Sequence, residues 1–285
     1  MNAAAVFFPV LLLIGTLAPF GLGVLVAAAS GFPPQGPVLA AASLAVVLLT
    51  LAGLASREAY APRLGPWPLW EKLPRQTWRR LAYACLILAG VLGILLQGVL
   101  CTGDFTIPLG ALGVFCGYFL FAPPLAWHRR GLGEFWGGLC FGLLPVLTGY
   151  YLPTDHLISE IPLYGIPLSL TAFNILLLLG FPRPGEEADS LSLAARLGPV
   201  GTGLLYTIVN ILVIVGLAIC LFFPAASNFG HAWLWSLIIL ALANQELVKR
   251  RAYYQEARIR LLCFSTLALL LGMDLIFALG LWGRL

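Results

Sequence analysis

The feature that most constrains this chain is a series of apolar stretches, each long enough to cross a bilayer as a helix. About 20 apolar residues in helical form span the hydrocarbon core of a membrane. Because backbone polar groups find no water in lipid, such stretches are predicted to be helices. The sequence therefore predicts an all-α integral membrane protein with about nine transmembrane helices. The nine stretches cover residues 4–29, 37–55, 80–100, 105–126, 135–152, 162–181, 200–223, 230–248 and 261–283.

Composition agrees with a membrane protein. Hydrophobic residues make up 60% of the 285 residues and charged residues only 10%, whereas about 45 to 50% of a soluble domain is apolar. Apolar stretches recur along the whole length, so we expect a single polytopic membrane domain over residues 1–285. The first stretch is too long for a signal peptide and no Lys or Arg precedes it, so we expect it to be a retained span. The six cysteines include no C-x-x-C pair, so we expect them to form no disulfide or metal framework.

Basic residues fall on one side of the predicted spans. Fifteen of the sixteen Lys and Arg residues lie in or beside the connections after spans 2, 4, 6 and 8, and only Arg284 lies on the other side. The positive-inside rule then predicts a protein of the inner (plasma) membrane with a cytoplasmic N-terminus and an outer C-terminus. The net charge of +4 is explained by this topology and by anionic lipid, so we expect no nucleic-acid partner.

The connection over residues 57–80 interleaves Trp67, Trp70 and Trp78 with basic residues and prolines. Such a segment is typical of a chain lying in the membrane interface. The alternative is a lid over a cavity, whose basic residues attract a charged ligand.

Two motifs resemble a known family. The stretch APPLAWHRRGLGEFWGGLCFGLLPVLTGYYL, residues 122–152, resembles a G-P-x-P-L-x-x-x-G-L-G-E element and the apolar span after it in intramembrane prenyltransferases of the UbiA superfamily. The dihydroxynaphthoate branch of menaquinone synthesis is especially similar. SLAARLG, residues 192–198, resembles the ending of that family's second signature.

The resemblance implies nine helices around a central cavity that is open to lipid. It also implies transfer of a polyprenyl group from its diphosphate to an acceptor, here a quinone precursor. Family members hold the diphosphate with Mg²⁺ on two aspartate-rich motifs, N-x-x-x-D after span 2 and D-x-x-x-D after span 6. Hard divalent ions prefer such carboxylate oxygens and neutralise the charge on the leaving pyrophosphate.

The sequence departs from both aspartate-rich motifs. The first reads LAGLASREAY, with Gly53, Ser56, Arg57 and Tyr60 near the family's Asn and Asp positions and Glu58 as its only carboxylate. The second has Arg183 near its first acidic position. By the resemblance, the remaining metal ligands are Glu58, Glu186, Glu187 and Asp189, with Glu187 and Asp189 as the catalytic pair.

The acidic cluster has a structural alternative. Pro184 followed by acidic residues, then Arg196 and Gly198 before Pro199, also fits a short capped helix whose dipole favours this order of charges.

Basic and polar residues complete the expected substrate site. Arg129 and Arg130 match the family element that helps to hold the diphosphate, and their alternative role is an ordinary positive-inside cluster. Arg57 and Arg183 are further phosphate ligands, since arginine makes bidentate contacts with phosphate. Asn174 is about two helical turns from the acidic cluster and is expected to line the cavity or to bond a neighbouring helix. Asp274, inside the last apolar stretch, is expected to face the bundle interior.

Two functional hypotheses follow. One is a polyprenyl transferase with altered metal ligands. The other is a non-catalytic relative that binds an isoprenoid or quinone, or that serves as a membrane partner subunit. A transporter is less favoured, because the sequence shows no internal repeat.

Overall fold

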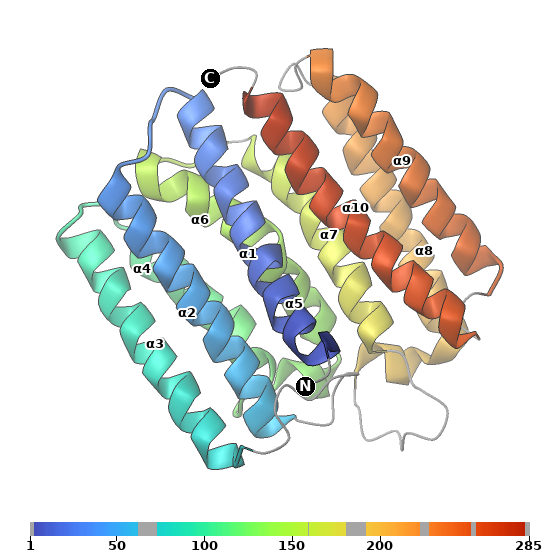
Figure 1. The fold of residues 1–285 in the computed structure, drawn as a ribbon, viewed down its shortest axis with the longest axis horizontal. Helices are drawn as coiled ribbons and strands as arrows, with labels where there is room; N and C mark the ends of the chain where they lie inside the picture. The colour runs from blue at the N-terminus through green and yellow to red at the C-terminus, as the bar shows by residue number, and fades with distance from the viewer. Residues whose placement is uncertain are drawn as a thin grey trace.

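The computed structural model describes residues 3–61, 73–158, 160–180, 192–222, 228–251 and 255–282, with side chains from residue 13 onward except 228–232 and 256. Every regular element in these ranges is a helix (Figure 1). The elements are α1 (Ala3–Ala29), α2 (Gly36–Tyr60), α3 (Arg75–Gly98), α4 (Thr106–Gly117), η1 (Tyr118–Leu120), η2 (Trp127–Arg130), α5 (Gly133–Phe141), α6 (Leu143–Thr154), α7 (Ile161–Leu179), α8 (Leu193–Phe222), α9 (Asn228–Lys249) and α10 (Glu256–Trp282).

The prediction of an all-helical membrane protein is confirmed. Each of the nine predicted spans coincides with one helix or with two consecutive helices. Six helical segments are long and apolar enough to cross a membrane: α2, α3, α5 with α6, α7, α8 and α10. Shorter apolar helices cover Leu13–Ala29 and Thr106–Leu120. The chain is therefore a multi-pass membrane protein.

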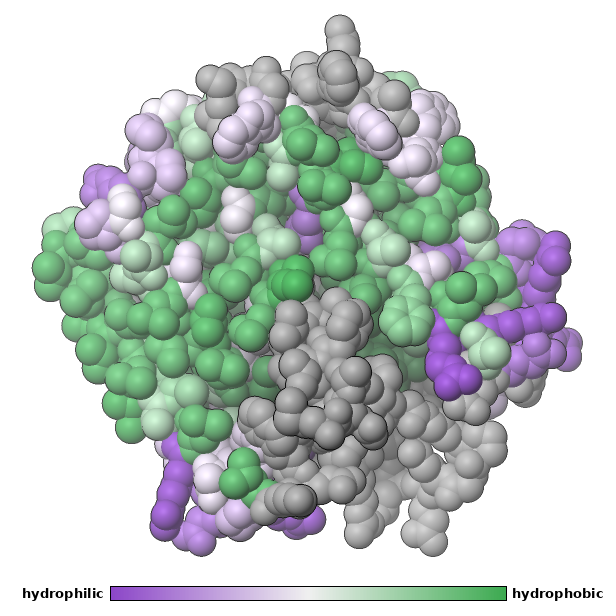
Figure 2. Space-filling view, in the orientation of Figure 1, coloured by the Kyte–Doolittle hydropathy of each residue, from purple (hydrophilic) through white to green (hydrophobic). Residues whose placement is uncertain are grey.

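Successive spans run in opposite directions, and α1 begins at the end of the bundle opposite to the one at which α10 finishes (Figure 1). We call the end at which α2 finishes and α3 begins the basic end, because Arg75, Arg79 and Arg80 open α3 there. Figure 2 shows hydrophobic side chains over most of the visible middle of the molecule. Hydrophilic side chains gather at the lower left, near the start of α3, and at the right, near the connection between α9 and α10.

The fifth predicted span, residues 135–152, is not one continuous helix. It is divided at Gly142 into α5 and α6, because α7 approaches closely at this point. A Cβ atom on Gly142 would clash with the backbone of Ser169, and the Ser169 hydroxyl accepts the Leu143 N–H at 2.7 Å. The Ser169 side chain thus satisfies a donor that the interrupted helix leaves open.

Two other boundaries differ from the predicted ones. The fourth span was expected to reach residue 126, but α4 ends at Gly117 and η1 ends at Leu120, shortly before Pro123 and Pro124, which cannot donate helical hydrogen bonds. Conversely, α8 begins at Leu193, seven residues before the predicted start. It bends at Gly198, which has a φ of 68° and directly precedes Pro199.

The second span is longer than predicted, and this changes the setting of two candidate site residues. The apolar stretch was expected to end at residue 55, but α2 continues to Tyr60. Arg57 and Glu58 therefore lie in the last turns of a helix. Both are buried, with 5% and 4% of their surface exposed, so they are not residues of a solvated loop.

The predicted interfacial segment is described only at its C-terminal end. Trp78, on α3, is buried and packs with Ala59 of α2 and Tyr118 of η1. Trp67 and Trp70 lie outside the described residues.

Among the side chains that the structure describes, four clusters of buried hydrophobic residues hold the helices together. The largest joins α1, α6 and α7 to α8, α9 and α10, with Tyr150, Leu217 and Met273 among its members. A smaller one lies toward the end opposite the basic end and contains Phe20 of α1, Ala42 of α2 and Leu152 of α6. We call this smaller cluster the floor cluster.

Candidate functional site

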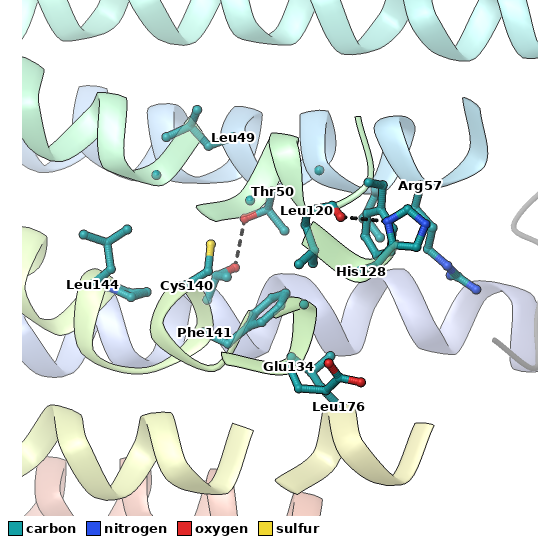
Figure 3. Close-up of a pocket in the computed structure, with 18 of the residues that line it drawn as sticks. Leu49, Thr50, Arg57, Leu120, His128, Glu134, Cys140, Phe141, Leu144 and Leu176 are labelled. Atoms are coloured by element: carbon teal, nitrogen blue, oxygen red, sulfur yellow. Dashed lines mark hydrogen bonds between the residues drawn. The ribbon is translucent and has the colours of Figure 1, made fainter. Parts of the chain in front are cut away.

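A cavity of about 230 Å³ lies between α1, α2, α4, α5, α6 and α7 (Figure 3). Its inner part is apolar, with Leu49, Leu109 and Leu144 in the walls. Helices α3, α9 and α10 contribute no lining residue among those described. The cavity is thus built by the first two thirds of the chain and is not surrounded equally by all the helices.

Glycines on α4 give the cavity its width. Gly110, Gly113 and Gly117 line it at a spacing of three and four residues, which places them on one face of the helix. A Cβ atom on Gly113 would lie 3.4 Å from Leu49 Cδ1, whereas one on Gly110 would have nothing within 4 Å. Space therefore remains in front of Gly110.

Three threonine hydroxyls face the inner cavity without making it polar. Thr16, Thr50 and Thr148 each donate a hydrogen bond to a carbonyl of their own helix, at 3.1, 2.8 and 2.8 Å. The hydroxyls of Thr16 and Thr50 also lie 3.1 Å apart, so either can donate to the other in place of its own helix and link α1 to α2. Because these donors are already used within the helices, an occupant needs no polar group in this part of the cavity.

The polar end of the cavity lies at the basic end of the bundle. Arg57, His128, Glu134 and Ser192 line it there, and Figure 3 shows Arg57, His128 and Glu134 together at the end away from Leu49 and Leu144. The cavity therefore joins an apolar interior to a charged entrance.

Glu134 is held by backbone at the start of α8. Its Oε1 accepts the N–H of Leu193 at 3.1 Å, and its carboxylate lies beside Gly180 at the end of α7. The Ser192 hydroxyl caps the same helix start by accepting the Ala195 N–H at 3.2 Å. Glu134 Oε2 is buried and has no hydrogen-bond partner among the described residues. One carboxylate oxygen is thus structural, and no described residue hydrogen-bonds the other.

His128 is positioned by the loop before α5. Its Nδ1 lies 2.9 Å from the Leu120 carbonyl, so Nδ1 carries the proton and donates in the neutral ring. Burial lowers the pKa of His128 and favours that neutral form. Gly133 allows this approach, because a Cβ atom there would lie 2.9 Å from His128 Cα. The second glycine of the G-L-G-E motif is therefore required by packing.

The two motif segments that carry the family resemblance meet at this end of the cavity. Arg196, from the second segment, donates through Nη2 to the Arg129 carbonyl of the first at 2.8 Å. The contact between Glu134 and Leu193 joins the same two segments. Segments about 60 residues apart in the sequence therefore form one entrance.

The predicted substrate ligands are placed differently from one another. Arg57 lines the cavity. Arg129 and Arg130 are exposed in η2, next to His128, and Arg130 lies over the Trp127 ring at 5.9 Å. Asn174 is buried in α7 and does not line the cavity. Its amide has no hydrogen-bond partner among the described side and main chains.

The predicted metal ligands are only partly described. Glu58 lies beside Arg57, 3.8 Å from its Nη1, and does not line the cavity. Arg183, Glu186, Glu187 and Asp189 lie outside the described residues. Within the described part of the chain, no three His, Cys, Asp or Glu side chains form a metal-binding group. These residues alone do not fit a Mg²⁺ site.

The capped helix that the sequence offered as an alternative role for the acidic cluster, between Pro184 and Gly198, is described only in its last part. Residues from Leu193 to the bend at Gly198 are helical, and Pro199 follows, as the sequence indicates. The cap is Ser192, however, and the proposed start at Pro184 lies outside the described residues.

Sequence reasoning missed three features of the site. Nothing in the sequence pairs Thr16 with Thr50, because helices in contact can be aligned in many registers. The glycines of α4 were visible at helical spacing, which could have indicated a face with room for a ligand. Glu134 was matched to the family motif, but its contact with Leu193 depends on tertiary structure.

Part of the chain is similar in sequence to a known protein. No family model matches the chain. The UbiA prenyltransferase domain-containing protein 1 of Dictyostelium discoideum is 30% identical to it over 116 residues. The match covers 40% of this chain and 35% of that protein. It supports the resemblance to the UbiA superfamily, and the dihydroxynaphthoate branch stays a prediction.

Proposed function

We propose that this chain is a membrane prenyltransferase of the UbiA superfamily, which moves a polyprenyl group from its diphosphate to an acceptor. The observation that carries the proposal is the cavity, whose apolar interior ends in a polar entrance formed by Arg57, His128 and Glu134. A prenyl diphosphate has the same division into an apolar tail and an anionic head. The partial similarity to a UbiA domain protein supports the same reading.

The head of the substrate would lie against Arg57. Its guanidinium is the cavity-lining cation among the described residues, and arginine forms paired hydrogen bonds with phosphate oxygens. We assign Arg129 and Arg130, which are exposed beside the entrance, to attracting the diphosphate from solvent. Arg183 remains a further proposed ligand. Asn174 has no part in this proposal, because it does not line the cavity.

The reaction would be an alkyl transfer. The bond between the allylic carbon and the diphosphate oxygen breaks, and diphosphate leaves with the electron pair. A carbon of the acceptor, which we propose is a quinone precursor, bonds to the allylic carbon and loses one proton. Glu134 Oε2 is buried at the entrance without a partner among the described residues. We propose that it accepts this proton.

Mg²⁺ is the ion that the family resemblance implies. If it is used here, residues 181–191 must supply carboxylates, so Glu186, Glu187 and Asp189 stay proposed ligands together with Glu58. Bound there, the ion would neutralise charge on the leaving diphosphate. The roles given above to Arg57 and Glu134 do not depend on it.

The second candidate is a protein that binds an isoprenoid or a quinone without turning it over. Gly53, Ser56, Arg57 and Tyr60 occupy the region of the first aspartate-rich motif, and this favours the candidate. Both candidates place the ligand in the same cavity and the same membrane. We propose the plasma membrane, with the basic end of the bundle in the cytoplasm.

Turnover separates the two candidates. The purified protein is incubated with radiolabelled geranylgeranyl or longer diphosphates and quinone precursors, with and without Mg²⁺. Release of pyrophosphate together with a prenylated product supports the transferase. Bound diphosphate or quinone without product, at all Mg²⁺ concentrations, supports the binding protein.

A further inference from the structure

A layer of packed side chains lies beyond the inner end of the cavity. Val46 lines the cavity and also packs against the floor cluster. Phe20, Ala42 and Leu152 of that cluster are buried, with 3%, 2% and 6% of their surface exposed. A chain that enters at Arg57 and runs along α2 therefore meets a closely packed layer beyond Val46.

The depth of the cavity follows from helix geometry. Arg57 and Val46 both line it and are eleven residues apart on α2. At ~1.5 Å per residue, this separation is ~16 Å along the helix axis. An extended chain advances ~3.4 Å per three bonds, so the four chain bonds of an isoprene unit span ~4.5 Å.

We propose that this depth limits the enclosed isoprenoid chain to three or four units, and that Gly110 leaves room for the last of them. This inference rests on the proposed function for its ligand class. Helices α2 and α4 pack so that Gly53 lies opposite Gly117, and Gly113 opposite Leu49. Gly110, one turn farther along α4, therefore lies near the level of Val46, at the inner end.

Substitution at Gly110 should shorten the cavity without harming the fold. A Cβ atom there meets nothing within 4 Å, and leucine is a better helix former than glycine. Thr148 lines the inner end from α6, so Thr148→Leu narrows it independently. Gly90→Leu on α3 is the matched control, because Gly90 is exposed, also has nothing within 4 Å, and does not line the cavity.

The test measures dissociation constants of geranyl, farnesyl and geranylgeranyl diphosphate, which contain two, three and four isoprene units. Each is measured on wild-type and variant protein in nanodiscs of phosphatidylcholine, by competition with radiolabelled farnesyl diphosphate. The ratio of variant to wild type cancels the partitioning of each ligand into lipid. The three corresponding alcohols are measured in the same way, to separate recognition of the tail from recognition of the head.

With Gly110→Leu, we expect geranylgeranyl diphosphate to bind about tenfold more weakly, since one unit loses its enclosed space, while geranyl diphosphate changes less than about twofold. Thr148→Leu should give the same pattern, and Gly90→Leu should change no ratio. If Gly110→Leu does not fold, Thr148→Leu alone decides the result.

The outcomes also separate this inference from the proposed function. If the variants weaken the binding of all three diphosphates equally, or of none, the proposed limit on chain length is wrong. The proposed function stands in that case, because the wild-type protein still binds the diphosphates. In another outcome, the variant-to-wild-type ratios for the alcohols depend on chain length while the diphosphate adds no affinity. That result supports the limit on chain length and contradicts the proposed transferase. Failure of every ligand to bind overturns both.

Discussion

Buried polar groups are bonded differently around the cavity and among helices α8, α9 and α10. Around the cavity, Arg57, His128 and Glu134 are gathered at an entrance where a ligand can reach them. On the side formed by α8, α9 and α10, polar groups mostly bond one another. The Asn210 amide donates to the Ala241 carbonyl and to Gln245 Oε1, at 2.8 and 3.1 Å.

This difference indicates where function lies. A buried polar group is costly in a membrane unless it is bonded, and interhelical pairs such as Tyr206 with Thr266 meet that cost by joining helices. Asp274 departs most from this pattern, since neither carboxylate oxygen has a hydrogen-bond partner among the described residues, and Asn210 Oδ1 and Asn244 Nδ2 also lack one. We therefore assign ligand binding to the cavity side and helix association to the α8–α10 side.

The largest expected effect comes from removing the charge at the entrance. Arg57 and Glu58 should be replaced together by Gln, because removing one charge alone would leave the other buried and uncompensated. We expect diphosphate affinity to fall by about 50-fold through loss of charged hydrogen bonds, as measured by the competition assay. Glu58→Gln alone is the control: it keeps Arg57, so without Mg²⁺ it should still bind the diphosphate, although the uncompensated guanidinium should lower its stability. Unchanged affinity in the double variant would show that Arg57 does not hold the diphosphate.

The proposed role of Glu134 Oε2 is tested by Glu134→Gln. Gln keeps an oxygen that can accept the Leu193 N–H and replaces Oε2 with an amide group that donates. We expect turnover to fall about 100-fold. The affinity for the prenyl diphosphate and the melting temperature should stay close to wild type. Glu134→Ala should also destabilise the protein by about 1 kcal/mol, through loss of the bond to the α8 start. Full turnover in Glu134→Gln would remove Glu134 from the chemistry.

The opposite result is expected on the α8–α10 side. Asn210→Ala leaves Gln245 and the Ala241 carbonyl without this donor, so we expect a loss of about 1 kcal/mol of stability. Affinity for geranylgeranyl diphosphate should stay within about twofold of wild type. Thermal unfolding in nanodiscs measures the first quantity and the competition assay the second. A stable variant with weakened binding would contradict the division between the two sides.

The smallest effect concerns His128 and pH. Burial lowers the pKa of His128 in the folded protein, so the unfolded chain binds a proton more readily. The contribution of neutral His128 to the free energy of unfolding should therefore be complete at pH 7.5. It should decrease as the pH drops below about 6.5, the usual histidine pKa. His128→Asn keeps a donor for the Leu120 carbonyl and has no such titration. Between pH 7.5 and 5.5, we expect the melting temperature of wild type to fall more than that of the variant, by at most about 3 °C.

Much of the fold could be predicted because the membrane imposes strong local rules. Long apolar stretches predicted the helices in order, and the G-L-G-E and L-A-A-R-L-G motifs marked two segments that meet in space. The end of α2 could not be predicted from hydropathy, since the adjacent charged residues Arg57 and Glu58 interrupt the apolar stretch, whereas the helix continues to Tyr60 and buries both. The break at Gly142 depends on Ser169 of another helix, which a local pattern does not contain.

The candidate site was less predictable than the fold. Arg57, His128 and Glu134 were visible as polar residues near the basic end of apolar stretches. Their convergence on one cavity depends on how α2, α5 and η2 pack, and a single sequence does not encode that register in any short motif.

The central claim is that the cavity holds an isoprenoid with its head at Arg57 and its tail toward Val46. The most direct test is photo-crosslinking with a farnesyl diphosphate analogue that carries a diazirine on its last isoprene unit, followed by peptide mass spectrometry. The account predicts crosslinks on the inner lining, at Val46, Leu109, Gly110 or Thr148, with excess farnesyl diphosphate preventing them. Crosslinks confined to α9 and α10, or to the exposed face of α3, would contradict it.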